Sequence, residues 1–451
     1  MQSTSNPAAA SPGAYQLRRK LTLTALILYG IVIVQPTAPM PLFGVVSQEA
    51  RGHVILPVLL AMIAMLLTAT SYGRMARVYP SAGSAYTYVA AEFGNTVGYL
   101  TGWVILLDYL LNPIICTIWC SKAAANFLPM IPIPLWSLSF ALLFTMLNLR
   151  GIEASARTNF WLAGLMSAVV AGMLFCMCRY ILHAGPHGVG YFTRPFYDPS
   201  TFSWNSIWQG TSVAALTYIG FDSISTLSEE AINPRRDILL ATVLTCLVTG
   251  VLASAEVYAA QLVWPHSIPF PDIDTAYVFV AGRAGGRVLF NLVNATLLIA
   301  TMGSGIGTQL GAARLLYGMG RDNALPRRFF GAINPKRGIP ARNVMFIGVL
   351  AFGGSLVMSY QLGAELLNFG AFLAFMGVNA ATIAYYIVKG RDRRWSFLVL
   401  PLGGFLVCLY TWANLRWTAK LAGAIWLTLG ILYGIYRWRF AKVQMKTVTG
   451  F

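Results

Sequence analysis

Long uncharged, mainly apolar stretches recur along the whole chain. A helix needs about 20 such residues to cross the hydrocarbon core of a bilayer. Twelve stretches meet or approach this length, and we expect a spanning helix in each: Leu21–Val46, Val54–Tyr72, Asn95–Ala124, Pro132–Leu149, Thr158–Cys178, Ser206–Ser228, Ile238–Trp264, Val288–Arg314, Val344–Tyr360, Glu365–Val388, Trp395–Leu415 and Leu421–Tyr436. The strands of a membrane β-barrel would instead alternate over about ten residues. The pattern therefore predicts an all-α integral membrane protein.

Composition and charge refine this prediction. Hydrophobic residues make up 57% of the chain and charged residues 10%, whereas about a quarter of residues are charged in soluble proteins. The net charge of +17 would suit nucleic acid, but its distribution argues against that partner. With the N-terminus in the cytoplasm, the inner segments hold 24 of the 32 Lys and Arg residues. This bias predicts that both termini are cytoplasmic, with a secondary attraction to the lipid bilayer surface.

Neither the cysteines nor the histidines suggest a chemical site. All six cysteines lie in or at the ends of expected helices, where they act as small apolar residues. The four histidines are scattered over expected outer segments without a metal-ligand spacing. We therefore expect no disulfide framework, no metal and no cofactor. The glycines Gly303, Gly307 and Gly311 are spaced by four, which predicts a close contact between helices.

The first expected helix carries two prolines in its middle, Pro36 and Pro39, flanking Thr37 and Ala38. Each proline removes a backbone donor and clashes with the preceding turn. Irregular backbone survives at membrane depth only where protein or a water-filled cavity satisfies it. One proline often gives a simple kink, but two with Gln35 beside them favour an unwound segment.

The sixth expected helix carries a second interruption. Gly220 stands two residues before Asp222, an acid near the middle of the span. Acids inside a membrane are costly and usually functional. The alternative is a packing role, in which exposed backbone amides satisfy the Asp222 carboxylate. Interruptions at matching positions of two halves are the best sequence indication of a secondary transporter's binding site; helices 1 and 6 match if helices 1–5 and 6–10 form an inverted repeat.

Several motifs together resemble the amino acid-polyamine-organocation (APC) superfamily, and their order is most similar to bacterial putrescine importer-like permeases. These motifs are Tyr72–Tyr88, Gly102-Trp103, Asp108-Tyr109, Gly220-Phe221-Asp222, Ser228–Pro234, Tyr317–Asp322 and Asn368–Ala371. The resemblance implies a LeuT-type fold with two inverted five-helix repeats, alternating access, and a location in the plasma membrane, here a bacterial inner membrane. The expected parts are an N-terminal tail (1–20), the first repeat (21–182), an outer loop (183–205), the second repeat (206–389), two peripheral helices (390–438) and a C-terminal tail (439–451).

The resemblance also implies a substrate site, carried over onto Gln35, Pro36, Thr37, Ala38, Pro39, Met40, Asp108, Tyr109, Tyr218, Ile219, Gly220, Phe221 and Asp222. Half-helix ends at the two breaks would offer amides to anions and carbonyls to cations. Asp108 and Asp222 would suit an ammonium group. Phe221 is either an apolar lid or cation–π partner or an ordinary packing residue.

The substrate class is open between amines and amino acids. Amino acid members of the superfamily commonly carry a Gly-rich break whose amides bind an α-carboxylate, whereas Pro36 and Pro39 donate no N–H. Putrescine importer-like members also carry proline there. We therefore expect import of a small organic amine such as putrescine or another polyamine; the alternative is an amino acid permease, either a proton- or sodium-coupled symporter or an exchanger.

Coupling and gating residues are also suggested. Some proton-coupled relatives carry a lysine in helix 5, where this chain has Met166 instead. Protonation of Asp108 or Asp222 would couple transport to protons; sodium would use helix 1 carbonyls with Ser304 and Thr308, for which helix packing is the favoured alternative. Glu229 and Glu230 lie near Arg235 and Arg236, and with Arg74 they would form either a cytoplasmic gate or a solvated charge cluster.

Two other classes of function are excluded by what the sequence lacks. An enzyme within the membrane would need a nucleophile and base or a metal cluster, and no such group is evident in the expected spans. A receptor would usually carry a soluble output domain, for which the loops are too short. No nucleotide-binding motif is present, so we expect a gradient-driven transporter and not an enzyme.

Overall fold

The computed structural model describes residues 20–80, 84–150, 156–183, 188, 190–228, 230–321, 325–334 and 339–439. The expected tails lie almost entirely outside these residues, and so does Glu229. Within them the secondary structure is helical, apart from one isolated bridge that pairs Leu21 with Ala231. The prediction of an all-α chain is confirmed.

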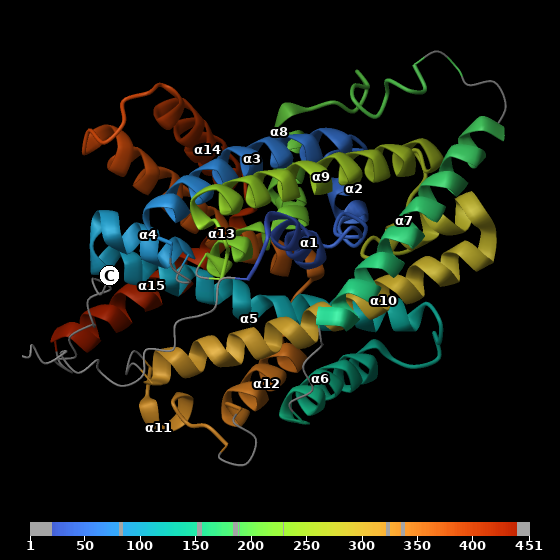
Figure 1. Ribbon diagram of the computed structural model, residues 1–451. Coiled ribbons are helices and arrows are strands. Elements are labelled where there is room, and N and C mark those ends of the chain that lie inside the picture. Colours follow the sequence, from blue (N-terminus) through green and yellow to red (C-terminus); the bar gives the residue numbers. More distant parts are fainter. Residues whose placement is uncertain are drawn as a thin grey trace, which may run out of the picture.

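The elements follow one another along the chain as Figure 1 shows, with the longest connection between α7 and α8. They are α1 (Leu23–Val34), α2 (Phe43–Glu49), α3 (Ile55–Val78), α4 (Ser84–Phe93), α5 (Asn95–Ala125), α6 (Ile133–Arg150), α7 (Ala156–His183), α8 (Trp204–Ala214), the 3₁₀ helices η1 (Ala215–Tyr218) and η2 (Phe221–Leu227), α9 (Pro234–Val263), α10 (Ala276–Arg321), α11 (Arg327–Phe330), α12 (Ala341–Val357), α13 (Tyr360–Ile383), the π-helical turn η3 (Ala384–Val388), α14 (Ser396–Ala413) and α15 (Trp417–Arg439).

Nine of the described helices are long and apolar enough to cross a membrane. The other three expected spans are represented by shorter elements. The first is divided into α1 and α2, the sixth into α8, η1 and η2, and the ninth is the apolar helix α12. The multi-pass architecture is thus confirmed, while the count of twelve and the inverted repeat stay predictions.

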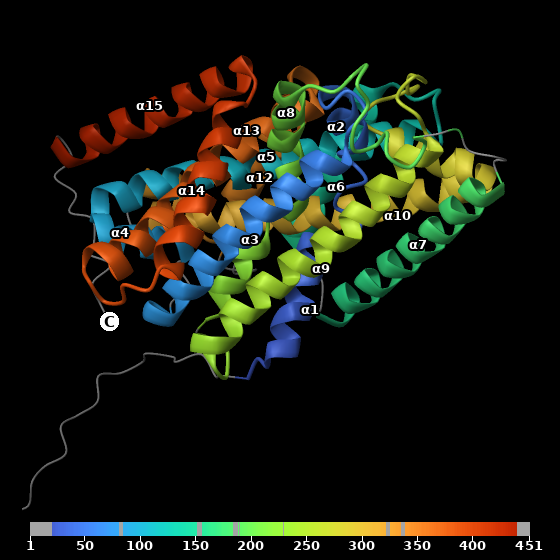
Figure 2. The ribbon, with the colours of Figure 1, turned by 90° about the horizontal axis from the view of Figure 1, so that it is seen from above.

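The helices pack into one bundle around α5. This helix contacts α4, α6, α10, α12, α13 and α15, while α3 runs alongside α9 (Figures 1 and 2). Close approach of α3 and α9 depends on Gly73, because a Cβ there would lie 2.5 Å from the Leu239 Cα. Helices α7 and α15 flank the bundle on different sides (Figure 2).

The helix α10 contains a kink that the sequence analysis did not place. Gly285 and Gly286 have non-helical angles, and Gly286 has φ +69°, which favours glycine. The expectation of a close contact at the glycines spaced by four is wrong for Gly303 and Gly307, since a Cβ on either would have nothing within 4 Å. The third glycine, Gly311, does approach α5, because a Cβ there would lie 3.3 Å from Tyr109, and the approach is closer at Gly305, where a Cβ would lie 2.6 Å from Phe144.

The two interrupted helices are tied together where the described chain begins. The backbone amides of Lys20 and Leu21 donate to the Glu230 carbonyl at 2.9 and 3.0 Å, and the Ile232 amide donates to the Leu21 carbonyl at 3.0 Å. This short backbone ladder joins the start of α1 to the segment between η2 and α9. The start of α1 and the chain just after η2 are therefore held together by backbone hydrogen bonds.

Candidate functional site: a cavity at two interrupted helices

The first interruption lies where the two prolines predict it. Helix α1 ends at Val34, and Gln35 has φ +65°, an uncommon conformation for a residue other than glycine. Pro36 and Pro39 supply no N–H, so the Val32 carbonyl cannot receive the helical bond expected from residue 36. Single turns replace the helix: the Ala38 amide donates to the Gln35 carbonyl at 3.2 Å, and the Met40 amide to the Thr37 carbonyl at 3.1 Å.

The second interruption is longer than the sequence suggested. Helix α8 gives way to η1, then to an extended Ile219 and to Gly220 at φ +113°. The chain continues as the 3₁₀ helix η2, and no α-helical half follows Gly220 before α9. Gly220 also faces the other interrupted helix, because a Cβ there would lie 2.7 Å from the Ile33 Cγ2. The two breaks are therefore neighbours in space.

A cavity of about 1060 Å³ lies beside both breaks. Its lining comes from α1 and the segment after it, from α4 and α5, from η1 and η2, and from α10 and α13. From Trp119 and Tyr360 it extends past the breaks to Arg314 and Met319, near the end of α10. A cavity of this size accommodates a small organic molecule.

Eight of the thirteen expected substrate-site residues line this cavity: Gln35, Thr37, Ala38, Asp108, Tyr109, Ile219, Gly220 and Asp222. The other five, Pro36, Pro39, Met40, Tyr218 and Phe221, are absent from the lining. Pro36 and Pro39 shape the break, and Met40 is fully buried in the apolar core.

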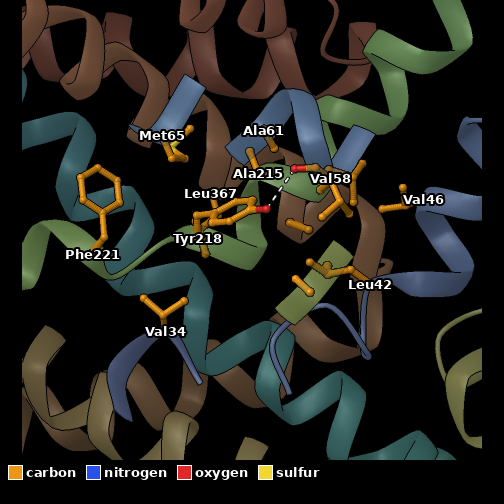
Figure 3. Close-up of a cluster of buried hydrophobic side chains, with 14 of the residues drawn as sticks. Val34, Leu42, Val46, Val58, Ala61, Met65, Ala215, Tyr218, Phe221 and Leu367 are labelled. Atoms are coloured by element: carbon orange, nitrogen blue, oxygen red, sulfur yellow. Dashed lines mark hydrogen bonds between the residues drawn. The ribbon is translucent and has the colours of Figure 1, made fainter. Parts of the chain in front are cut away.

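Tyr218 and Phe221 belong to the packed core (Figure 3). The Tyr218 hydroxyl donates to the Val58 carbonyl at 2.9 Å, as the dashed line in Figure 3 marks. The Phe221 ring packs against Tyr72 and Phe375, with centroids 5.5 and 5.3 Å away. Of the two roles considered for Phe221, this conformation matches ordinary packing.

The two acids of the cavity differ in their surroundings. Asp108 lies in the middle of the regular helix α5, whereas Asp222 stands in the first turn of η2. Backbone groups of Gly220 and Ser223 interact with the Asp222 carboxylate, so backbone satisfaction, the packing alternative, is part of its environment. Each residue is half-buried, and the two carboxylates are close enough to interact electrostatically. Arg314 places a cation elsewhere on the lining.

Several lining residues were missed by the sequence analysis. On α5 they include Asn112, Cys116 and Trp119. With Asp108 they follow the spacing of one helix face, in which residues three or four apart are neighbours. That spacing from Asp108 is the signal that would have found them.

The sodium candidates Ser304 and Thr308 line the same cavity. The Thr308 hydroxyl donates to the Ser304 carbonyl at 2.8 Å and lies 3.2 Å from the Asn112 Oδ1. The Thr308 hydroxyl is therefore already hydrogen-bonded where α5 packs against α10. The Thr37 hydroxyl lies 4.0 Å from the Met166 sulfur, so the helix 5 position that carries lysine in some relatives faces the first break here.

The expected cytoplasmic gate is arranged differently from the prediction. Arg74 donates to the Ser396 carbonyl at 2.7 Å, and its guanidinium lies 4.4 Å from the Phe397 ring centroid. The backbone carbonyl of Glu230 accepts hydrogen bonds from the amides of Lys20 and Leu21. Because α14 supplies the Arg74 contacts, a gate formed by Arg74 and Glu230 needs another conformation.

A different ion pair joins the same end of the bundle. The Lys389 Nζ lies 3.0 Å from the Glu92 Oε2, and the Tyr79 hydroxyl donates to the Glu92 Oε1 at 2.9 Å. These residues follow η3, end α4 and follow α3, respectively. They therefore connect three elements far apart in the sequence.

The opposite end of the bundle is closed by two polar clusters. Lys122 of α5 lies 2.5 Å from Asp274 and 3.4 Å from Asp272, just before α10. Burial raises the pKa of the Asp274 carboxyl, and the neighbouring Lys122 opposes that rise.

The second cluster joins α2 to α13. The Gln361 amide donates to Glu49 at 2.8 Å and to Glu365 at 3.1 Å, with Arg416 about 4 Å from both carboxylates. Both clusters bridge elements on different sides of the cavity.

Membrane-length helices around a cavity at two interrupted helices are typical of secondary transporters. The chain belongs to the amino acid permease family, whose sequence model matches residues 41–437. It is 33% identical over 431 residues to the low-affinity putrescine importer PlaP of Escherichia coli (strain K12), with 93% of each chain covered.

Other relatives have different cargoes in their names. The branched-chain amino acid permease BcaP of Lactococcus lactis subsp. cremoris is 28% identical, with 91% of this chain and 92% of the relative covered. The methylthioribose transporter of Bacillus subtilis is 25% identical, with 95% of each chain covered. These relatives are transporters, so the chain is a membrane transporter of the amino acid permease family and not an enzyme.

Proposed function

We propose that the protein imports a small organic amine, putrescine or a similar polyamine, by proton-coupled alternating access. The observation that carries this proposal is the presence of two carboxylates, Asp108 and Asp222, on one cavity beside both helix breaks. An ammonium group gains charge-assisted hydrogen bonds from a carboxylate. A diamine has two such groups and so matches two acids. The 33% identity to a putrescine importer supports the same substrate class.

The proposed orientation follows the positive-inside bias, with both termini in the cytoplasm of a bacterial cell. The end of the cavity at Arg314 and Met319 then faces the cytoplasm, and the Lys122 and Glu49 clusters close the outer side. This is the conformation from which an importer releases its cargo. The LeuT-type inverted repeat of residues 21–182 and 206–389 is part of the proposal.

Protons are the proposed coupling ion, and sodium bound near Ser304 and Thr308 is the second candidate. The alternative cargo is an amino acid, which the family and the relative BcaP favour. Against it stand Pro36 and Pro39, which remove amides that would bind a carboxylate at the first break.

Competition binding on the purified protein separates these cargoes. Radiolabelled putrescine is bound in a scintillation proximity assay and competed with unlabelled putrescine, butylamine, leucine and arginine. We expect putrescine to compete at least about tenfold better than butylamine, because one charge-assisted bond is worth about 1.5–3 kcal/mol. Leucine should not compete.

Binding of labelled leucine together with no binding of putrescine would contradict the amine proposal and support the amino acid alternative. Equal competition by butylamine and putrescine would contradict the assignment of one ammonium group to each carboxylate.

A further inference from the structure

Glu256 is an acid for which the proposed transport cycle has so far no use. It lies on α9, about two turns before that helix ends at Val263. Its exposed fraction is 0%, and both carboxyl oxygens are buried without a hydrogen-bond partner. In the part of the chain that the structure describes, no other carboxyl group has both oxygens in this condition. Glu256 is not among the residues that line the cavity.

The elements packed against α9 supply no cation for this carboxyl. Alongside it, residues 55–65 of α3 carry no ionisable side chain. On η1, the Tyr218 hydroxyl is bound to the Val58 carbonyl, and on α7 the Tyr180 hydroxyl receives a bond from Arg283. The ionisable residue of α1 is Tyr29, which is partly exposed. Among the described residues, none of the charged side chains interacts with Glu256.

The group that does face Glu256 comes from the start of α10. Tyr277 is close enough to interact electrostatically with the carboxyl, and its own hydroxyl is buried without a partner. The nearby Thr275 hydroxyl is in the same condition. Polar atoms left unpaired in this way are costly. An ionised carboxylate at this place would cost far more than the neutral acid.

Helix α2 covers Tyr277 and Glu256, and α2 would move if the protein opened toward the outer solution. The Tyr277 ring packs edge-on against Phe43 of α2, with centroids 5.4 Å apart. Gly44 lies so close to the start of α10 that a Cβ there would come within 2.6 Å of the Ala276 Cβ. Helix α2 is the short half of the first interrupted helix. Separation of α2 from α10 would therefore expose Tyr277 and then Glu256 to the outer solution.

We propose that Glu256 is a proton-binding site of the transport cycle. It takes a proton from the outer solution while α2 and α10 are apart, only the neutral acid allows the outer side to close, and the proton returns to the outer solution when the two helices separate again. The proton forms an O–H bond on one carboxyl oxygen, and no other bond changes. The inference rests on the proposed import function, because closure of the outer side is a step of import.

A separate proton site also resolves a difficulty of charge. A carboxylate that binds the ammonium group of a substrate cannot hold a proton at the same time. Protonation of Asp108 or Asp222 would therefore exchange a proton for the amine. Glu256 is buried, unpaired and outside the cavity, so its protonation does not compete with binding of the amine.

The variant Glu256→Gln keeps the shape of the neutral acid and cannot ionise. We measure the initial rate of putrescine uptake in whole cells over a series of external pH values. In the wild type, the rate should fall as pH rises, approaching tenfold per unit where one proton is required. Uptake by Glu256→Gln should be independent of pH and near the wild-type rate at low pH. The control Asp198→Asn removes a carboxylate of the outer loop 191–203, which pairs with Ser200, and should keep the wild-type profile.

A wild-type pH profile in Glu256→Gln, or an inactive variant that purifies as a monodisperse protein, overturns the proposal. Should the variant not fold, the wild-type protein carries the test, because dicyclohexylcarbodiimide reacts with neutral carboxyl groups in apolar surroundings. Modification of Glu256 at pH 7, detected by mass spectrometry, supports the proposal, and an unmodified Glu256 overturns it. Labelling does not depend on cargo, so a wild type that takes up no amine would refute the proposed function separately.

Discussion

Asp222 shares its cavity with Asp108, but the Asp222 side chain also contacts the backbone around it. Backbone groups of Gly220 and Ser223 interact with the Asp222 carboxylate, so this side chain has a local role in η2 as well as a charge. Asn at this position still accepts hydrogen bonds but carries no charge. The substitution Asp222→Asn therefore separates substrate binding from the local contact.

We expect Asp222→Asn to lower putrescine uptake about 10- to 100-fold, because a hydrogen bond to a charged group contributes about 1.5–3 kcal/mol. The measurement is the initial rate in cells, normalised to the amount of purified protein. Asp198→Asn serves as the control, since Asp198 lies on an outer loop and binds Ser200 at 2.6 Å. Uptake unchanged by Asp222→Asn would mean that its carboxylate serves packing alone.

The positions of individual side chains could be predicted from the sequence only in part. Asp108, Thr37 and Asp222 could be placed at the cavity because the family resemblance implies them, and the proline and glycine breaks agree for Thr37 and Asp222. Tyr218 and Phe221 could not, because the 3₁₀ turns of η1 and η2 rotate them into the core. The surroundings of Arg74 and Glu256 depend on residues far along the chain. No local pattern shows that the Ser396 carbonyl accepts a hydrogen bond from Arg74, or that the Glu256 carboxyl has no hydrogen-bond partner.

The two helix breaks, at Gln35 and at Gly220, differ in how far the sequence predicts them. Proline residues made the first break predictable in position and form. The second was predictable in position only, since glycine and an acid do not reveal that 3₁₀ helices, Ala215–Tyr218 and Phe221–Leu227, lie on both sides of the break. Gly220 satisfies two demands, a φ of +113° and close approach of Ile33.

We expect Gly220→Ala to destabilise the protein and to slow transport. A left-handed conformation costs a residue with a Cβ about 1–2 kcal/mol, and the added Cβ would lie 2.7 Å from the Ile33 Cγ2. Thermal unfolding in detergent, followed by intrinsic fluorescence, measures the change. The control Gly303→Ala adds a methyl group within helix α10, where nothing lies within 4 Å, and should leave the melting temperature unchanged or raise it. A Gly220→Ala protein as stable and active as the wild type would show that this backbone is not strained.

At the scale of the whole molecule, the requirements of the lipid bilayer made the helical architecture predictable from the sequence. Apolar runs long enough to cross the bilayer predicted the main helices, because a spanning helix must satisfy its backbone internally. The sequence did not reveal the polar contacts at the two ends of the bundle. Those contacts join Lys122 to Asp274, Glu49 to Gln361 and Lys389 to Glu92, each across more than one element.

These contacts give the molecule its direction in the proposed cycle. In the proposed orientation, the Lys122 and Glu49 clusters lie on the outer side, while the cavity extends from the breaks toward Arg314 and Met319. The backbone ladder between residues 20–21 and 230–232 ties both interrupted helices together. In the proposed cycle, the start of α1 and the segment after η2 should therefore move together.

The central claim, proton-driven import of a diamine, is tested most directly by uptake of radiolabelled putrescine into proteoliposomes that contain the purified protein. Uptake is compared under an inward proton gradient, under an inward sodium gradient and with no gradient. The account predicts transient accumulation of putrescine above equilibrium with the proton gradient alone. Accumulation with sodium alone would contradict proton coupling, and accumulation of an amino acid in place of putrescine would contradict the proposed cargo.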